Sequence, residues 1–137
     1  MPHDPARVAD VKAWLAKATV DLRAAKHDRT AKPPITEDIV FHAQQLVEKS
    51  LKAFLCWHDV PFRKTHNLIE VGELCATIDG TLEPLLKNAA GLTEYAWKYR
   101  YPGEMEVPPV SEADEAIHIA DNVYKAVLGR LPKETHP

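Results

Sequence analysis

A short stretch near residue 100 combines side chains of the kinds that bind nucleotides. Residues 95–103 read YAWKYRYPG, with aromatic and cationic side chains closely interleaved: Tyr95, Trp97, Lys98, Tyr99, Arg100 and Tyr101. Aromatic rings and guanidinium planes stack on bases, and arginine also binds phosphate through two parallel hydrogen bonds. The stretch predicts a nucleotide or RNA site, with Arg100 on phosphate and Tyr101 or Tyr99 on a base. The alternative is a packed corner of a helical core in which Arg100 pairs with a glutamate.

A second basic stretch, FRKTH at 62–66, lies in a loop that opens a predicted helix. It contains Arg63, Lys64 and His66. The backbone N–H groups at a helix start attract anions, and three basic side chains would add to that attraction. The stretch predicts a contact to phosphate or to an RNA backbone. The alternative is an exposed basic turn in which His66 caps the helix or packs against it.

The sequence predicts no metal site and no cofactor. Seven histidines are scattered along the chain. Two pairs have a helical spacing, and both are weak metal-ligand signals: His118–Asp121 and His42–Gln45. The five glycines form neither a P-loop nor a dinucleotide-binding fingerprint. Cys56 and Cys75 lack a CxxC spacing and are expected to be buried thiols in a reducing compartment.

Composition and charge fit one ordinary globular domain. The chain has 137 residues, of which 45% are hydrophobic and 27% charged, enough to build a core. A net charge of −3 argues against general attraction to nucleic acid. Residues 1–32 are basic and 101–121 acidic, which predicts two solvated faces or a bipolar surface that docks on a second copy or a partner. No signal region or membrane-length apolar run is visible, which favours a soluble cytoplasmic protein without membrane contact.

Hydrophobic periodicity predicts five helices. The first begins with a cap at Asp4 and runs to about His27. The second, over 37–59 with a cap at Thr36, has the widest apolar arc and is expected to be the central helix. The third spans about 67–78.

The last two helices are expected to begin at Thr81 and Ser111, both as capping residues, with Asp114 completing a capping box at the last one. The fourth helix leads into Tyr95 and Tyr99, and the last runs to about residue 131. A lone strand at 95–101 would leave its backbone groups unpaired, so we expect none. The prediction is an all-α, antiparallel up-and-down bundle of four to five helices, a single domain over 1–137 with its core at about 5–131.

Four segments in this order resemble the HEPN domain family. They are FHAQQLVEKSLKAFL in the second helix, the KTHNL turn, the RYP at 100–102, and a final helix rich in alanine and acids. The likeness covers about residues 8–130. It implies a helical bundle, a homodimer, and action beside a minimal nucleotidyltransferase. It also implies nucleotide binding and, in many branches, metal-independent RNA cleavage.

The resemblance also carries over particular residues. Gln45, Glu48 and Lys49 match the polar run of the family's second helix, and we expect it to be structural in part, with His66 satisfying Glu48 or a backbone carbonyl. Residues 64–67 match the family's KTHNL turn and 100–102 its RYP.

The ribonuclease branch carries an arginine followed, after four to six residues, by a histidine. Two Arg–His pairs in this sequence depart from that pattern. Three residues separate Arg23 from His27, and two separate Arg63 from His66. RNA cleavage without metal needs a proton-transfer group and a cation that holds the phosphate. Neither of these two pairs has the family's spacing, although another His–Arg pair could meet across a dimer.

The leading hypothesis is a non-catalytic nucleotide- or RNA-binding subunit, dimeric and acting with a nucleotidyltransferase, in which Arg100 and Lys64 contact phosphate. The second is a ribonuclease toxin of a toxin–antitoxin pair, with His66 as general acid/base and Arg63 or Arg100 holding the phosphate. The third is a homodimeric interaction module without a small ligand.

Overall fold

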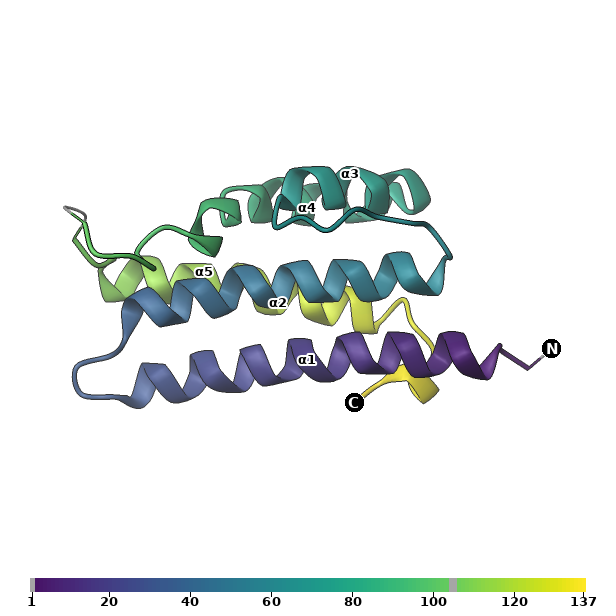
Figure 1. Cartoon of the computed structure of the whole chain (residues 1–137), viewed down its shortest axis with the longest axis horizontal. Helices are drawn as coiled ribbons and strands as arrows, with labels where there is room; N and C mark the ends of the chain where they lie inside the picture. The colour runs from purple at the N-terminus through teal and green to yellow at the C-terminus, as the bar shows by residue number, and fades with distance from the viewer. Residues whose placement is uncertain (1, 104–105) are drawn as a thin grey trace.

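The computed structural model describes residues 2–103 and 106–137, and these form helices without any strand (Figure 1). Glu104, one of the acidic residues of the segment 101–121, lies outside the described residues. The elements are α1 (Pro5–Thr30), α2 (Thr36–Trp57), α3 (Leu68–Ile78), η1 (Gly80–Leu82), α4 (Glu83–Ala90), η2 (Thr93–Ala96), α5 (Val110–Leu128) and η3 (Lys133–Thr135). The all-α prediction is confirmed.

Helix α2 is the centre of the bundle, as its wide apolar arc predicted. It packs against α1, α3, α5 and the short helix η2. Its side chains Leu46, Leu51 and Phe54 are almost completely buried. Helices α1 and α2 run antiparallel, α5 lies behind α2, and α3 and α4 cover the remaining side (Figure 1). The loop between α1 and α2 and the segment that leads to α5 lie at the same end of the bundle, so this end gathers residues distant in sequence.

The first helix begins as predicted and is slightly longer. Asp4 caps it, because its carboxylate accepts a hydrogen bond of 3.0 Å from the Ala6 N–H, and Pro5 occupies the first turn. The helix continues past His27 to Thr30, where the sequence KPP ends it. Near this end, Arg29 pairs with Asp114 of α5 at 2.7 Å, which joins the basic and acidic regions within one chain.

Three predicted caps are wrong. Thr36 and Thr81 lie inside their helices, and Ile35 precedes α2 without a side-chain cap. Asp79 is the capping residue at η1, where its carboxylate accepts from the Thr81 N–H at 2.9 Å. Helix α5 begins at Val110 rather than Ser111 and likewise has no side-chain cap. In each case a neighbouring residue takes the flanking position, and sequence does not distinguish between candidates one or two residues apart.

The fourth helix does not reach Tyr95 and Tyr99 as predicted. Helix α4 ends at Ala90, and the chain forms η2 over Thr93–Ala96 before it turns again. Tyr99 has a positive φ of 67°, a left-handed backbone that a helix excludes. Residues 97–103 are therefore a compact irregular loop, and the side chains predicted to share a helix face are placed by turns.

Helix α2 ends in a Schellman motif centred on Asp59. The Val60 N–H donates to the Leu55 carbonyl at 3.0 Å, the Asp59 N–H donates to the Cys56 carbonyl at 3.1 Å, and Asp59 has a φ of 55°.

Replacing Asp59 by glycine is expected to stabilise the fold by about 0.5–1 kcal/mol, because glycine adopts this backbone without steric cost. The ion pair of Asp59 with Arg7 is long, at 3.8 Å, and exposed, so little is lost with it. Urea unfolding of both proteins measures the change. Asp59→Ala, which keeps the steric cost, is the control and should not be more stable than the parent.

One further finding concerns membranes. Within the described part of the chain, no helix combines the length and the apolarity that crossing a bilayer requires.

Candidate functional site

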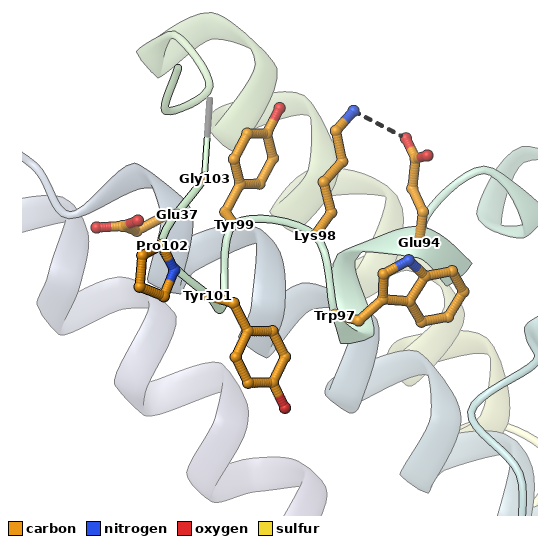
Figure 2. A pocket seen from close by; sticks show the side chains of 8 residues that line it. All are labelled: Glu37, Glu94, Trp97, Lys98, Tyr99, Tyr101, Pro102 and Gly103. Carbon is orange, nitrogen blue, oxygen red and sulfur yellow. Dashed lines mark hydrogen bonds and ion pairs between the residues drawn. The ribbon is translucent and has the colours of Figure 1, made fainter. Parts of the chain in front are cut away.

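A groove of about 590 Å³ opens along the loop after η2. Its lining residues are Glu37, Glu94, Trp97, Lys98, Tyr99, Tyr101, Pro102 and Gly103. Figure 2 shows Tyr99 and Lys98 directed to one side of the loop and Tyr101 to the opposite side, while Trp97 extends sideways below Glu94. Tyr101 is 80% exposed and Trp97 is 55% exposed. These two rings do not belong to the core, which contradicts the interpretation of the whole stretch as a packed corner.

The other two aromatic side chains of the stretch are structural. Tyr95 is buried, and its ring stacks on Tyr99 with the centroids 6.3 Å apart. Burial and the neighbouring Glu112 carboxyl raise the pKa of Tyr95 above its usual value of 10, so this phenol stays protonated. Tyr99 was predicted to stack on a base. It lines the groove, but one ring face already contacts Tyr95, so Tyr101 is the better placed of the two.

Both cations of the stretch have acidic partners. Arg100 donates to the Asp38 carboxylate at 3.3 Å, and its guanidinium lies 3.8 Å from the ring centroid of Phe41. Lys98 pairs with Glu94 at 3.3 Å and lies over the Tyr99 ring. The partner of Arg100 is thus an aspartate on α2 rather than a glutamate. Both pairs reach solvent and contribute little to stability, so a phosphate group can replace the carboxylate.

The KTHNL turn is held against α2 by a buried polar network. Glu48 and Lys52 form a buried ion pair of 3.1 Å. Lys52 also donates to the Thr65 carbonyl at 3.0 Å, and Gln44 donates to the His66 carbonyl at 3.0 Å. The predicted contact between His66 and Glu48 is confirmed, with 2.7 Å between Nδ1 and Oε1.

The same turn starts α3. The side-chain carbonyl oxygen of Asn67 accepts hydrogen bonds from the N–H groups of Ile69 and Glu70, which makes Asn67 the N-cap. The Leu68 N–H donates to the Thr93 hydroxyl of η2 at 3.2 Å. This bond joins the KTHNL turn to the segment that carries the groove.

The structure does not pair the two residues proposed for RNA cleavage. Arg63 binds the Glu70 carboxylate with 2.8 Å to each oxygen, and its side chain is 72% exposed. His66 is held by Glu48 through Nδ1, and its side chain is 63% exposed. Lys64 is exposed and makes no ion pair with the described residues. Of these three residues, Lys64 alone remains a cation without a competing carboxylate.

The remaining polar residues of α2 form a second cluster with α1. Lys49 pairs with Asp21 at 2.6 Å, and Asp21 also contacts His42 Nδ1 at 2.8 Å. Gln45 donates to Gln44 at 2.6 Å. Gln45 and Lys49 thus have structural partners, as predicted.

The second cluster continues to the groove. His42 Nε2 lies 3.2 Å from Asp38, and Asp38 in turn contacts Arg100. Asp28, at the end of α1, completes the cluster. The Asp21 carboxylate, followed by Asp38, raises the pKa of His42. Burial and the Asp38 carboxyl raise the pKa of Asp28 to about 6.

A model of the HEPN domain family matches residues 11–131. The chain belongs to the HEPN family. Further comparison matched it to no curated protein and to no solved structure. Membership confirms the resemblance drawn from the four motifs, and it indicates a nucleotide- or RNA-related function or a helical interaction module.

Within this HEPN domain, some of the sequence motifs have a structural role and one lies on the exposed surface. Glu48 and Lys52 of α2 and the KTHN turn are mainly structural, since their polar atoms bind one another. The RYP segment carries the exposed groove. Cys75 is buried as predicted, but Cys56 is only half-buried.

One Arg–His pair with the ribonuclease spacing was missed, because five residues separate Arg130 from His136. In the structure, Arg130 binds the Asp79 carboxylate at 2.8 Å and His136 contacts the Leu128 carbonyl at 2.9 Å.

Asp28, Asp38 and the groove residue Glu37 were not predicted from the sequence either. One signal was present, because Asp38 stands four residues before His42 and such residues share a helix face. The contribution of Asp28 depends on how α1 meets α2, which the local sequence does not specify.

Proposed function

We propose that this HEPN domain is a non-catalytic nucleotide- or RNA-binding subunit whose site is the groove along residues 97–103. The observation that carries the proposal is the exposure of Trp97 and Tyr101 on a loop that also carries Lys98 and Arg100. Exposed rings beside cations are the usual means of binding single-stranded nucleic acid or a nucleotide without metal. The groove volume of about 590 Å³ is in the range of small-molecule sites.

In this proposal the base stacks on Tyr101 or Trp97. Glu37 and Glu94 in the lining accept hydrogen bonds, and carboxylates accept readily from exocyclic amino groups. They therefore favour adenine, cytosine or guanine over uracil. Arg100 turns from Asp38 to a phosphate oxygen, and Lys64 on the adjoining turn extends the phosphate contact.

Dimer formation and action beside a minimal nucleotidyltransferase also belong to this proposal. Both are inferred from what members of the family commonly do. After a bound phosphate leaves, Arg100 would pair with Asp38 again. The site therefore does not need a binding partner to stay folded.

The test is isothermal titration calorimetry with ATP, GTP, CTP, UTP and a short single-stranded RNA. Tyr101→Ala is expected to weaken binding about 5- to 100-fold, because stacking contributes about 1–3 kcal/mol per base. Arg100→Ala should weaken binding about tenfold or more through the lost phosphate contact. UTP should bind more weakly than the three nucleotides that carry amino groups.

Lys125→Ala is the matched control, because Lys125 is an exposed cation in an i, i+4 pair with Asp121 and lies outside the groove lining. Its affinity should equal that of the parent. If the Arg100→Ala and Tyr101→Ala proteins bound nucleotides and RNA as tightly as the parent, the proposed site would be contradicted. Absence of binding by every nucleotide and by RNA would favour the interaction module instead.

One observation favours RNA cleavage as a second candidate. His66 is exposed, and a buried carboxylate holds its Nδ1, which is how a general base is commonly oriented. Arg63 is paired with Glu70, and this pairing argues against a role of Arg63 in holding the phosphate. Incubation of the protein with RNA in EDTA, beside a His66→Gln protein, distinguishes the two: cleavage lost in His66→Gln would replace the binding proposal by the ribonuclease.

A further inference from the structure

Three side chains that could bind a metal ion meet beside the groove, where α1 ends and α2 begins. Asp28 comes from the last turns of α1, and Asp38 and His42 lie one turn apart on α2. One ligand atom of each lies within 4.8 Å of the other two. The separation of 3.2 Å between His42 Nε2 and Asp38 Oδ2 suits two ligands of one ion bound at about 2.0–2.2 Å.

The orientation of the His42 ring is fixed by a contact on its Nδ1 side. Asp21 is 5% exposed, and its carboxylate contacts His42 Nδ1 at 2.8 Å. The Lys49 ammonium binds the second oxygen of Asp21 at 2.6 Å and holds this carboxylate in place. A carboxylate can only accept, so Nδ1 carries a proton, and Nε2 is the nitrogen that binds a metal ion when it gives up its own proton. Nε2 is then directed at the two other carboxylates, which is the carboxylate–histidine arrangement that supports metal ligands in many proteins.

Asp28 supplies an independent observation. The residue is 9% exposed, and its Oδ2 is buried without a hydrogen-bond partner among the described residues. Buried carboxylate oxygens in folded proteins are nearly always paired. Asp28 and Asp38 also face each other, so their repulsion is relieved either by a proton on Asp28 or, once both are ionised, by a cation between them.

We propose that Asp28, Asp38 and His42 bind one divalent first-row metal ion, with Zn²⁺ the preferred species. One imidazole nitrogen and two carboxylate oxygens suit Zn²⁺ or Mn²⁺, whereas Mg²⁺ takes oxygen ligands. The side chains of Asp38 and His42 are 31% and 20% exposed, so a remaining ligand position faces solvent. Asp38 also binds Arg100, and through this one carboxylate the ion would adjoin the groove.

The test uses the full chain after treatment with EDTA and dialysis, titrated with Zn²⁺ in a calorimeter. We expect saturation at one ion per chain and a rise in Tm of several degrees when Zn²⁺ is about a hundredfold above its Kd. Asp28→Asn and His42→Gln are each expected to weaken Zn²⁺ binding at least tenfold, and Asp21→Asn about 10- to 100-fold through the lost support of His42. Mg²⁺ should not compete.

His118→Gln is the matched control. His118 is an exposed histidine on α5, near Asp121 and Asn122, and it tests for adventitious binding by a surface imidazole. Unchanged affinity in this protein and reduced affinity in Asp28→Asn would support the site. No saturable binding by the parent, unchanged binding by Asp28→Asn, or loss of the stoichiometric ion in His118→Gln would overturn it. Circular dichroism of each variant shows that it is folded, and Asp28→Asn, which is nearly isosteric, serves if His42→Gln does not fold.

Discussion

Replacing Lys52 by methionine is expected to lower the free energy of unfolding by about 3–5 kcal/mol, because the change leaves a buried carboxylate without its cation. The side chains of Lys52 and Glu48 are each 6% exposed. The loss also removes the hydrogen bond from Lys52 to the Thr65 carbonyl, which holds the KTHNL turn to α2. Single domains are stable by about 5–15 kcal/mol, so this one change removes a large part of the total. Urea unfolding followed by circular dichroism measures it.

The chain offers a matched control for this prediction. Lys87 and Glu83 form an i, i+4 pair of 2.9 Å with the same residue types as Lys52 and Glu48, but both side chains are exposed. Lys87→Met should therefore cost less than about 0.5 kcal/mol. The double change Glu48→Gln with Lys52→Met removes both charges and should recover much of the loss. A Lys52→Met protein as stable as Lys87→Met would show that burial of the first pair has no energetic consequence.

Stability is expected to fall by about 3 kcal/mol as the pH rises through the titration of Asp28. The pKa of Asp28 is about 6 in the folded chain and 3.8 in the reference state, so the folded state binds this proton more tightly. Its contribution is fully present below pH 3.8 and is lost as the pH rises through about 6. The charged groups that act on Asp28 are Asp38, which raises its pKa, and His42 and His27, which lower it.

Asp28→Asn tests this assignment. An amide can donate to Asp38 at every pH, so the variant should lose the decline and exceed the parent by about 2 kcal/mol near neutral pH. Both proteins are unfolded with urea at a series of pH values in EDTA, which excludes any contribution from bound metal. The raised pKa of His42 predicts a further decline of the same sign above its usual value of 6.5, and this decline should remain in both proteins. An equal slope in both proteins below pH 6 would assign the titration to another group.

The helical bundle could be predicted from sequence because its information is local. The apolar arc of α2 and the Asp4–Pro5 start of α1 specify burial and direction within a few residues. The contact between His66 and Glu48 was predicted only as one of two options, because a buried polar run needs partners but does not specify which ones. The path after α4 could not be predicted, because Leu92, Tyr95 and Tyr99 keep a helical spacing although the backbone leaves the helix at Gly91.

The candidate sites were less predictable because they depend on where separate segments meet. Arg100 was predicted to contact phosphate, or in the alternative to pair with a glutamate. Its partner in the structure is Asp38, 62 residues earlier on α2. The exposure of Tyr101 and Trp97 follows from the turn at Tyr99, a residue for which a positive φ is uncommon. Asp28 has a polar neighbourhood only because the end of α1 faces the start of α2.

The position of Trp97 gives the protein a natural optical reporter. Of the three tryptophans, Trp97 is 55% exposed in the groove, whereas Trp14 and Trp57 are partly buried against the core. Indole emission shifts and is quenched when a base stacks nearby, so occupancy of the groove would change the red-shifted part of the spectrum and leave the rest unaltered. A Trp97→Phe protein supplies the baseline, and the groove can then be followed in real time without a dye or a label.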